Sequence, residues 1–190
     1  MNSIMDETGK VAGGSLLLAQ KTVVAEIQRS IRQGYHRLLV LGPPHSRRLE
    51  AVRSAFATFR TEAIVIELLG VRTRYELDVA FQRATGANDF YGGMRKLMRL
   101  AQRRRIAVVF HNLDGCSGLP CEEYVVYRVW MEARHHCGAT HVVFTARDPE
   151  FVARCFERYE RGRNLVYPIN LASDSPWDFP GEHSKQGGML

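Results

Sequence analysis

The residues of this sequence that could do chemistry begin with the segment Gly42-Pro43-Pro44-His45-Ser46-Arg47-Arg48. It follows a short apolar run at 37–42, and Leu49, Val52, Phe56 and Phe59 continue it with the spacing of an amphipathic helix. A buried strand, a glycine turn and a helix form the arrangement in which backbone N–H groups and the helix dipole bind phosphate. The segment therefore predicts a loop at the position of a phosphate site.

This loop resembles the Walker A segment of the AAA+ family of P-loop ATPases, whose pattern is G-x-x-x-x-G-K-[ST]. Its Gly-Pro-Pro start fits the pattern. His45 stands where such loops usually carry glycine, and Arg47 replaces the second glycine. Arg48 replaces the lysine, and Leu49 replaces the hydroxyl residue that holds Mg²⁺. Arg47 brings a side chain where glycine lets the backbone wrap the phosphates, and leucine cannot ligate a metal.

Two later apolar runs resemble further motifs of the same family. Residues 108–114 resemble the Walker B strand, but His111 and Asn112 stand where the family has its Mg²⁺-supporting Asp and its catalytic Glu. Asp114 lies three residues past the metal position and does not replace it. Residues 141–149 resemble the sensor-1 strand, with Thr145 at the sensor position.

The motif's lysine, hydroxyl residue, Asp and Glu are all replaced, by Arg48, Leu49, His111 and Asn112. Phosphoryl transfer depends on these parts, because it is catalysed by positioning and by electrostatic stabilisation. We therefore expect no hydrolysis, no enzyme activity and no cofactor, with residual ATP or ADP binding as an alternative. The resemblance covers about residues 15–170 and is greatest to AAA+ ATPases of transposition, secretion-associated or initiator type. A separate helical lid, usual in the family, has no room in the sequence.

The pattern of apolar residues predicts the elements that position these motifs. Continuous apolar runs at 37–42, 63–68, 106–110, 141–145 and 165–169 alternate with helical periodicity at 15–33, 49–59, 74–84, 91–103, 122–136 and 151–159. Such alternation predicts a three-layer, doubly wound α/β domain of the P-loop NTPase type, with about five parallel strands and no lid. We expect a flexible N-terminus at 1–14, one domain at 15–170 and a flexible Pro/Gly/Ser-rich tail at 171–190.

A second cluster of charge lies at the end of one predicted helix. The chain has 26 Lys and Arg against 20 Asp and Glu, a net charge of +6. Six of these basic residues fall within 95–105: Arg95, Lys96, Arg99, Arg103, Arg104 and Arg105. Three of them recur every fourth residue, so they share one helix face. The face suits nucleic-acid phosphates, acidic residues of a protein partner, or solvent alone.

Three further features of the sequence bear on its function. A zinc site is suggested by Cys116, Cys121, His135, His136, Cys137 and His141. A helix over 122–136 would place its two ends about 20 Å apart, so we expect no metal site, with a site confined to His135, Cys137 and His141 as the alternative. Trp177 and Phe179, in an acidic Pro-containing segment, fit either a docking motif or a cap on the domain's own apolar edge. No leader or membrane-spanning run is visible, so we expect a cytoplasmic protein with reduced thiols.

Together these features predict a catalytically inactive AAA+-like domain, a pseudo-ATPase that acts as a protein-binding scaffold or regulatory subunit. Its partner would be an active ATPase or a second copy of the chain, and the surfaces expected to bind it are Arg47, Arg48 and the basic residues of 95–105. Two alternatives remain: a DNA- or RNA-associated accessory factor of transposition-ATPase type, and a nucleotide-binding sensor without hydrolysis.

Overall fold

The computed structural model describes residues 21–43, 46–120, 122–126, 129, 140–159 and 167–170. After a helix over 21–32, the elements follow in the order β1 (Arg37–Leu41), α2 (Arg48–Ala57), β2 (Glu62–Glu67), α3 (Arg74–Thr85), α4 (Phe90–Arg103), β3 (Ile106–His111), the 3-10 helix η1 (Leu113–Cys116), β4 (His141–Ala146), α6 (Pro149–Tyr159) and β5 (Tyr167–Asn170). Helical residues at 122–126 precede β4. Within these described ranges, no helix has the length and apolarity needed to cross a membrane.

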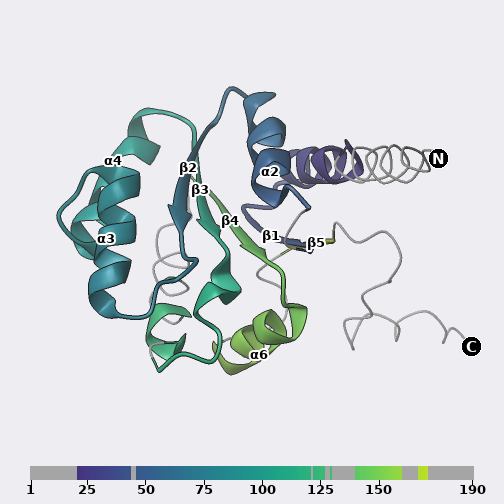
Figure 1. The fold of residues 1–190 in the computed structure, drawn as a ribbon. Coiled ribbons are helices and arrows are strands. Elements are labelled where there is room, and N and C mark those ends of the chain that lie inside the picture. Colours follow the sequence, from purple (N-terminus) through teal and green to yellow (C-terminus); the bar gives the residue numbers. More distant parts are fainter. Residues whose placement is uncertain are drawn as a thin grey trace, which may run out of the picture.

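The strands form one parallel sheet with the order β2-β3-β4-β1-β5 (Figure 1). Because all strands are parallel, their carboxyl ends meet at the same edge, and the loop after β1 lies beside the ends of β4 and β3. The connections from the neighbouring strands β1 and β4 leave toward opposite edges of the sheet, through α2 and α6. This is the switch point at which doubly wound folds place a binding crevice.

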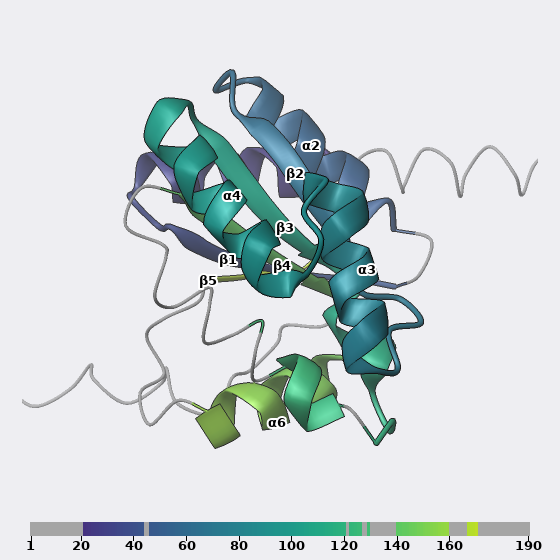
Figure 2. The ribbon, with the colours of Figure 1, turned by 90° about the vertical axis from the view of Figure 1, so that its left-hand side faces the viewer.

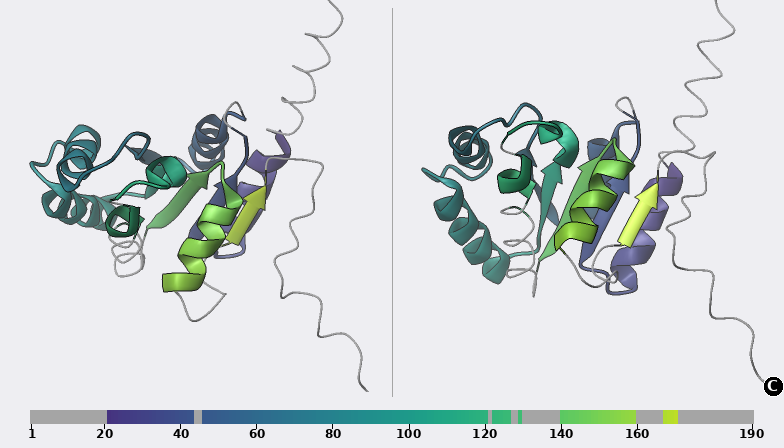
Figure 3. Two further views of the ribbon diagram at one scale, coloured as in Figure 1. Left: turned by 60° about the horizontal axis from the view of Figure 1, so that its bottom comes forward. Right: turned by 90° about the horizontal axis from the view of Figure 1, so that it is seen from below.

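Side chains alternate between the two faces of each strand, which explains why the strands are apolar throughout. One face buries Leu39, Leu41, Val108 and Phe110 against α3, α4, η1, α6 and three valines that precede β4, Val125, Val126 and Val129. The other face buries Leu38, Val40 and Val109, among others, against α2 and the helix over 21–32. Figures 2 and 3 show this division, with α3 and α4 on the β2 side of the sheet and α6 crossing it near β4. The three-layer, parallel α/β prediction is confirmed.

Local signals set the ends of the helical pair α3 and α4. Thr73 caps α3 by accepting a hydrogen bond from the Glu76 N–H, and Gly86, with a left-handed φ of 68°, ends it. Asp89 caps α4 in the same way through the Gly92 N–H. The helices approach closely, because a Cβ at Gly93 would lie only 2.7 Å from a ring carbon of Phe81. The pair is therefore a rigid layer against β2 and β3.

The predicted strand and helix positions agree with the described elements to within about two residues, where the two can be compared. The first predicted helix is described from residue 21 onward, and the predicted helix over 122–136 is described only at 122–126 and 129. The predicted termini at 1–14 and 171–190, including Trp177 and Phe179, lie outside the described residues.

Candidate functional site: the loop after β1

The loop after β1 turns its hydrogen-bonding groups onto its own chain. The Gly42 N–H donates to the Ala146 carbonyl (3.2 Å), and the Ser46 N–H and hydroxyl both donate to the Pro43 carbonyl (3.0 and 2.6 Å). Pro44 and His45 lie outside the described residues. A phosphate loop presents its N–H groups to the anion. Here the N–H groups of Gly42 and Ser46 are already bonded within the protein.

Arg47 has a left-handed backbone conformation at the position where the motif has its second glycine. Its φ is 51° and its ψ 39°, in the left-handed region that glycine enters without strain. It is the N-cap of α2, and its side chain makes no capping hydrogen bond. The loop therefore holds an arginine in a backbone conformation that favours glycine.

Arg48, at the position of the motif's lysine, lies inside the protein. Its side chain is only 5% exposed. Its guanidinium donates from Nη1 to the Gly42 carbonyl and, at 3.3 Å, to the Pro43 carbonyl, while Nη2 donates to Asn112 Oδ1 at 2.9 Å. This corrects the expectation that Arg48 contributes to a partner-binding surface, because the side chain holds the loop from within.

Asn112 links Arg48 to a carboxylate on the neighbouring strand. Its Oδ1 accepts from Arg48, and its Nδ2 donates to Glu67 Oε1 at 2.9 Å. Because arginine only donates and a carboxylate only accepts, these partners fix the orientation of the amide. Asn112 has a left-handed φ of 58°, which asparagine tolerates better than most residues. The neutral amide of Asn112 thus connects the buried guanidinium of Arg48 to the half-exposed carboxylate of Glu67.

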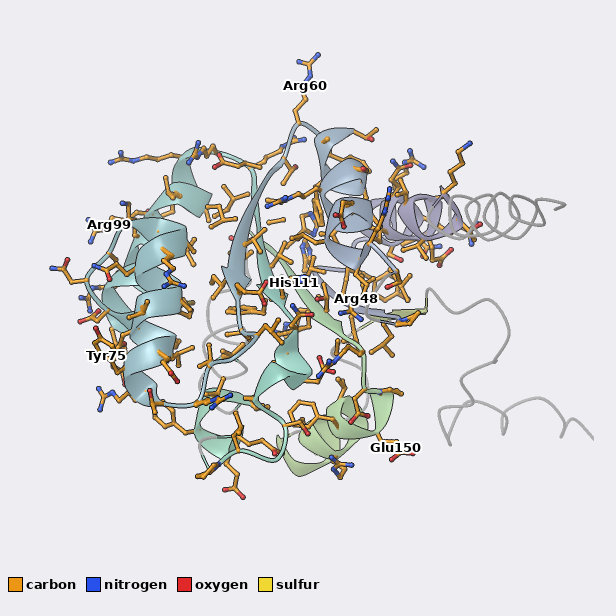
Figure 4. The ribbon with its side chains drawn as sticks, viewed as in Figure 1. Arg48, Arg60, Tyr75, Arg99, His111 and Glu150 are labelled. Carbon is orange, nitrogen blue, oxygen red and sulfur yellow. The ribbon has the colours of Figure 1, made fainter. Side chains whose placement is uncertain are left out.

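The register of the sheet explains why these side chains meet. Glu67 is paired with His111 across β2 and β3, and Phe110 is paired with Phe144 across β3 and β4. The next residues, His111 and Thr145, therefore share one level, and Asn112 begins the loop just above it. Figure 4 shows Arg48 and His111 together near the carboxyl ends of the strands.

His111 is bonded to the sensor-like Thr145. Its Nδ1 lies 2.6 Å from Thr145 Oγ1, which also accepts from the Asn112 N–H at 3.1 Å. The other ring nitrogen, Nε2, lies 4.0 Å from Glu67 Oε2. Burial lowers the pKa of His111, with the Glu67 charge opposing and the Arg48 charge adding to the effect. This environment favours the neutral form of the imidazole.

Asp114 is a buried carboxylate near Arg48. Burial lowers the pKa of Arg48, and the negative charge of Asp114 opposes that change. Asp114, only 1% exposed, accepts through Oδ2 from the Arg147 N–H (3.2 Å), the Arg147 Nε–H (3.1 Å) and the Asp148 N–H (3.0 Å). It therefore fastens η1 to the connection between β4 and α6. Its role is structural, in agreement with its displacement from the motif's metal position.

The site brings together two groups that the sequence did not indicate as site residues, Glu67 and Arg147. Glu67 was visible only as the polar end of an apolar run, and no local pattern marks its partner 45 residues away. Among the residues that the structure describes, no three His, Cys, Asp or Glu side chains are grouped so that they could hold a metal ion. Of the suggested zinc ligands, His141 lies on β4, whereas Cys121, His135, His136 and Cys137 are outside the described residues.

The basic residues of 95–105 are all exposed on α4 and the turn after it: Arg95, Lys96, Arg99, Arg103, Arg104 and Arg105. They lie opposite the buried Met94 and Leu97. Arg99 projects away from the sheet in Figure 4. Arg104 forms an ion pair with Glu62 at 2.6 Å. This surface is separate from the loop after β1, so the two clusters of basic charge do not form one site.

No protein-family model matches the sequence. No curated protein matches it.

Solved structures, by contrast, share its fold. The chain is similar to one chain of the structure of Drosophila ORC bound to AT-rich DNA and Cdc6, with 8% identity, a TM-score of 0.50, and coverage of 92% of this chain and 64% of that one. It is also similar to a chain of the structure of Drosophila ORC bound to GC-rich DNA and Cdc6, with 7% identity, a TM-score of 0.50, and coverage of 93% of this chain and 66% of that one. The Aeropyrum pernix ORC1 protein in complex with DNA matches with 14% identity, a TM-score of 0.49, and coverage of 78% of this chain and 45% of that one. The chain thus spans less than two thirds of each of these chains.

The likeness to the two Drosophila structures, together with the parallel sheet and its strand order, establishes the architecture that the motifs predicted. The chain therefore has the fold of an AAA+ ATPase-like domain.

Proposed function

We propose that this chain is a catalytically inactive AAA+-like domain that acts as a protein-binding scaffold or regulatory subunit. The observation that carries the proposal is the position of Arg48, whose guanidinium is buried and bonded to the carbonyl oxygens of the loop and to Asn112. The loop thus holds a cation of its own chain where related loops hold phosphate. Glu67 adds a negative charge at the same edge of the sheet.

The energetic argument concerns what a nucleotide would have to displace. A hydrogen bond to a charged group contributes about 1.5–3 kcal/mol, so breaking the bonds to Gly42 and Asn112 costs roughly 3–6 kcal/mol. Each 1.4 kcal/mol lowers affinity tenfold, which places the penalty at about 10²- to 10⁴-fold. With Asn at the position of the catalytic Glu, no carboxylate is available there to polarise an attacking water. Both arguments favour a protein-binding role over nucleotide binding and hydrolysis.

Calorimetry of the full chain with ATP and with ADP, each with and without Mg²⁺, tests this proposal. We expect no saturable heat at millimolar nucleotide and no phosphate release above the buffer rate. Saturable binding without hydrolysis would favour the nucleotide-sensor alternative, and phosphate release would overturn the proposal. A matched variant restores the motif residues: Arg47→Gly, Arg48→Lys, Leu49→Thr, His111→Asp and Asn112→Glu. Heat in that variant alone would locate the loss of binding in these positions.

Purification of the tagged full chain from its native cells tests the scaffold role. We expect a protein partner in stoichiometric amount, either an ATPase or a further copy of the chain. A solitary monomer under gentle, low-salt conditions would count against the proposal.

A nucleic-acid-associated function is the second candidate, and the exposed basic residues of α4 favour it. Arg95, Arg99 and Arg103 repeat along one face, which suits successive phosphates. The two Drosophila structures of the same fold contain DNA, AT-rich in one and GC-rich in the other. DNA binding would fall steeply with salt, and Arg99→Glu with Arg103→Glu would abolish it. Absence of binding at low salt would exclude this function.

A further inference from the structure

The connection between β2 and α3 exposes large apolar side chains that no part of the described structure covers. Three large hydrophobic residues are exposed within the described ranges: Tyr35 (44%), Leu69 (59%) and Tyr75 (76%). Two of these lie within seven residues of each other, between the end of β2 and the first turn of α3. Figure 4 shows Tyr75 projecting from α3 away from the sheet. We call Leu69, Arg72, Arg74 and Tyr75 the β2–α3 surface.

This surface is held rigidly by hydrogen bonds. The Leu69 N–H donates to Glu67 Oε1 (2.9 Å), the carboxylate oxygen that also accepts from Asn112. The Arg72 N–H donates to Glu76 Oε2 (2.6 Å), and the Thr73 hydroxyl accepts from the Glu76 N–H (3.2 Å). A segment whose backbone is already ordered loses less conformational entropy when a partner binds. An exposed tyrosine on an ordered backbone is therefore suited to recognition.

Packing against η1 restrains the same connection. A Cβ at Gly115 would lie 2.8 Å from the Leu69 Cα and 2.9 Å from the Leu68 carbonyl oxygen. The backbone of the connection therefore packs closely against the backbone of η1. Together with the bond from Leu69 to Glu67, this contact ties the β2–α3 surface to the network around Arg48.

The charge of the surface indicates the chemistry of its partner. Arg72 and Arg74 are exposed, whereas the nearby Glu76 carboxylate is occupied by the Arg72 N–H and the Thr73 hydroxyl. Tyrosine and arginine are also the residue types enriched where binding energy concentrates in interfaces. The fitting partner is an acidic segment that carries aromatic side chains.

The chain itself contains such a segment. Residues 174–182 read Asp-Ser-Pro-Trp-Asp-Phe-Pro-Gly-Glu, with three acidic residues, two large aromatic residues and no basic residue. We propose that residues 174–182 of one copy dock on the β2–α3 surface of a second copy, with Trp177 and Phe179 against Leu69 and Tyr75 and the carboxylates toward Arg72 and Arg74. This inference deepens the proposed function by naming the partner as a second copy.

The fold favours a contact between copies over one within a chain. β5, which ends at Asn170, and β2 are opposite edges of the sheet, four strand spacings or about 19 Å apart. Tyr75 lies farther out, on the helical layer beyond β2 (Figure 4). Seven residue steps separate Asn170 from Trp177, and they span at most about 25 Å when fully extended. Trp177 could therefore approach Tyr75 of the same chain only if this segment were almost fully extended, whereas a second copy imposes no such requirement.

Such a contact joins two different surfaces, so each copy is both donor and acceptor and the association is head-to-tail. Sedimentation velocity of the full chain over a range of concentrations tests it. We expect the mean mass to rise with concentration and to fall at high salt. A surface variant (Arg72→Glu with Tyr75→Ser) and a segment variant (Trp177→Ser with Asp178→Lys) should each remain monomeric. Their 1:1 mixture should form a heterodimer and stop there, because each variant keeps one intact half of the contact.

Two further variants separate this contact from general effects of charge or folding. Arg60→Glu makes the same charge change at an exposed residue far from the surface (Figure 4) and should leave association unchanged. Combining Arg72→Glu and Arg74→Glu with Asp174→Lys and Asp178→Lys in one chain reverses both halves and should restore association. A wild-type monomer at all concentrations, or a variant mixture that stays monomeric, overturns the inference. Nucleotide calorimetry is unaffected by either result, so the inactive-domain proposal stands or falls separately.

Discussion

Replacing Arg48 with methionine removes the guanidinium from the loop while keeping a side chain of similar reach. The Gly42 carbonyl and Asn112 Oδ1 then lose a charged donor, and the Pro43 carbonyl loses a longer contact of 3.3 Å. At about 1.5–3 kcal/mol per bond to a charged group, two good bonds correspond to roughly 3–6 kcal/mol. Relief of the cost of burying the charge, a few kcal/mol, opposes this loss. The expected net destabilisation is about 2–3 kcal/mol.

Urea unfolding of the full chain measures this change through the midpoint at constant slope. At roughly 2–4 °C per kcal/mol for a domain of this size, Tm should also fall by about 4–12 °C. Arg53→Met is the matched control, because Arg53 is an exposed arginine on the same helix, and its effect should stay within about 0.5 kcal/mol. Arg48→Lys should fall between the two, since an ammonium keeps the charge but lacks the planar fork. If Arg48→Met matched Arg53→Met, the guanidinium would not hold the loop and the reasoning would be refuted.

Three other outcomes can be measured on the same protein. Burial lowers the pKa of both His111 and His141, so the unfolded chain binds protons that the folded chain does not. The free energy of unfolding should therefore decrease as pH falls from about 7.5 to 5.5, and His141→Gln should reduce that slope. A flat profile, or one that rises as pH falls, would contradict this. Arg47→Gly should raise the free energy of unfolding by up to about 1 kcal/mol, because it relieves a left-handed φ, whereas Arg47→Val should lower it. The opposite order of the two urea midpoints would show that the loop follows another path. Asp114→Asn should cost about 1–3 kcal/mol by weakening the bonds to Arg147 and Asp148, while the exposed Glu150→Gln, on α6, should be nearly neutral in the same titration.

The strands and helices could be predicted because their signals are local. Apolar runs such as 106–110 are buried on both faces of a parallel sheet, and the capping residues Thr73 and Asp89 begin their helices as sequence rules expect. The replacement of the motif residues could also be recognised from the sequence, because each motif position is defined by its residue type. His111 and Asn112 in place of two carboxylates needed no structure to be recognised.

The direction of Arg48 could not be read from the sequence. An arginine at the start of a helix can point outward or inward, and its choice depends on acceptors supplied from elsewhere. Here those acceptors are two loop carbonyls and the amide of Asn112, 64 residues away. The same holds for Glu67, whose partners are set by the register of β2 against β3.

The sequence by itself therefore determined the class of fold and the absence of the residues for phosphoryl transfer, since both depend on residue types and short periodicities. Only the tertiary structure decided that Arg48 is buried and holds the loop from within, whereas the basic residues of 95–105 are exposed on α4 and the turn after it. It also decided that Leu69 and Tyr75 are left uncovered on a rigid connection. The physical reason is that strand order and register bring distant residues together, and neither is encoded in any short stretch of the chain.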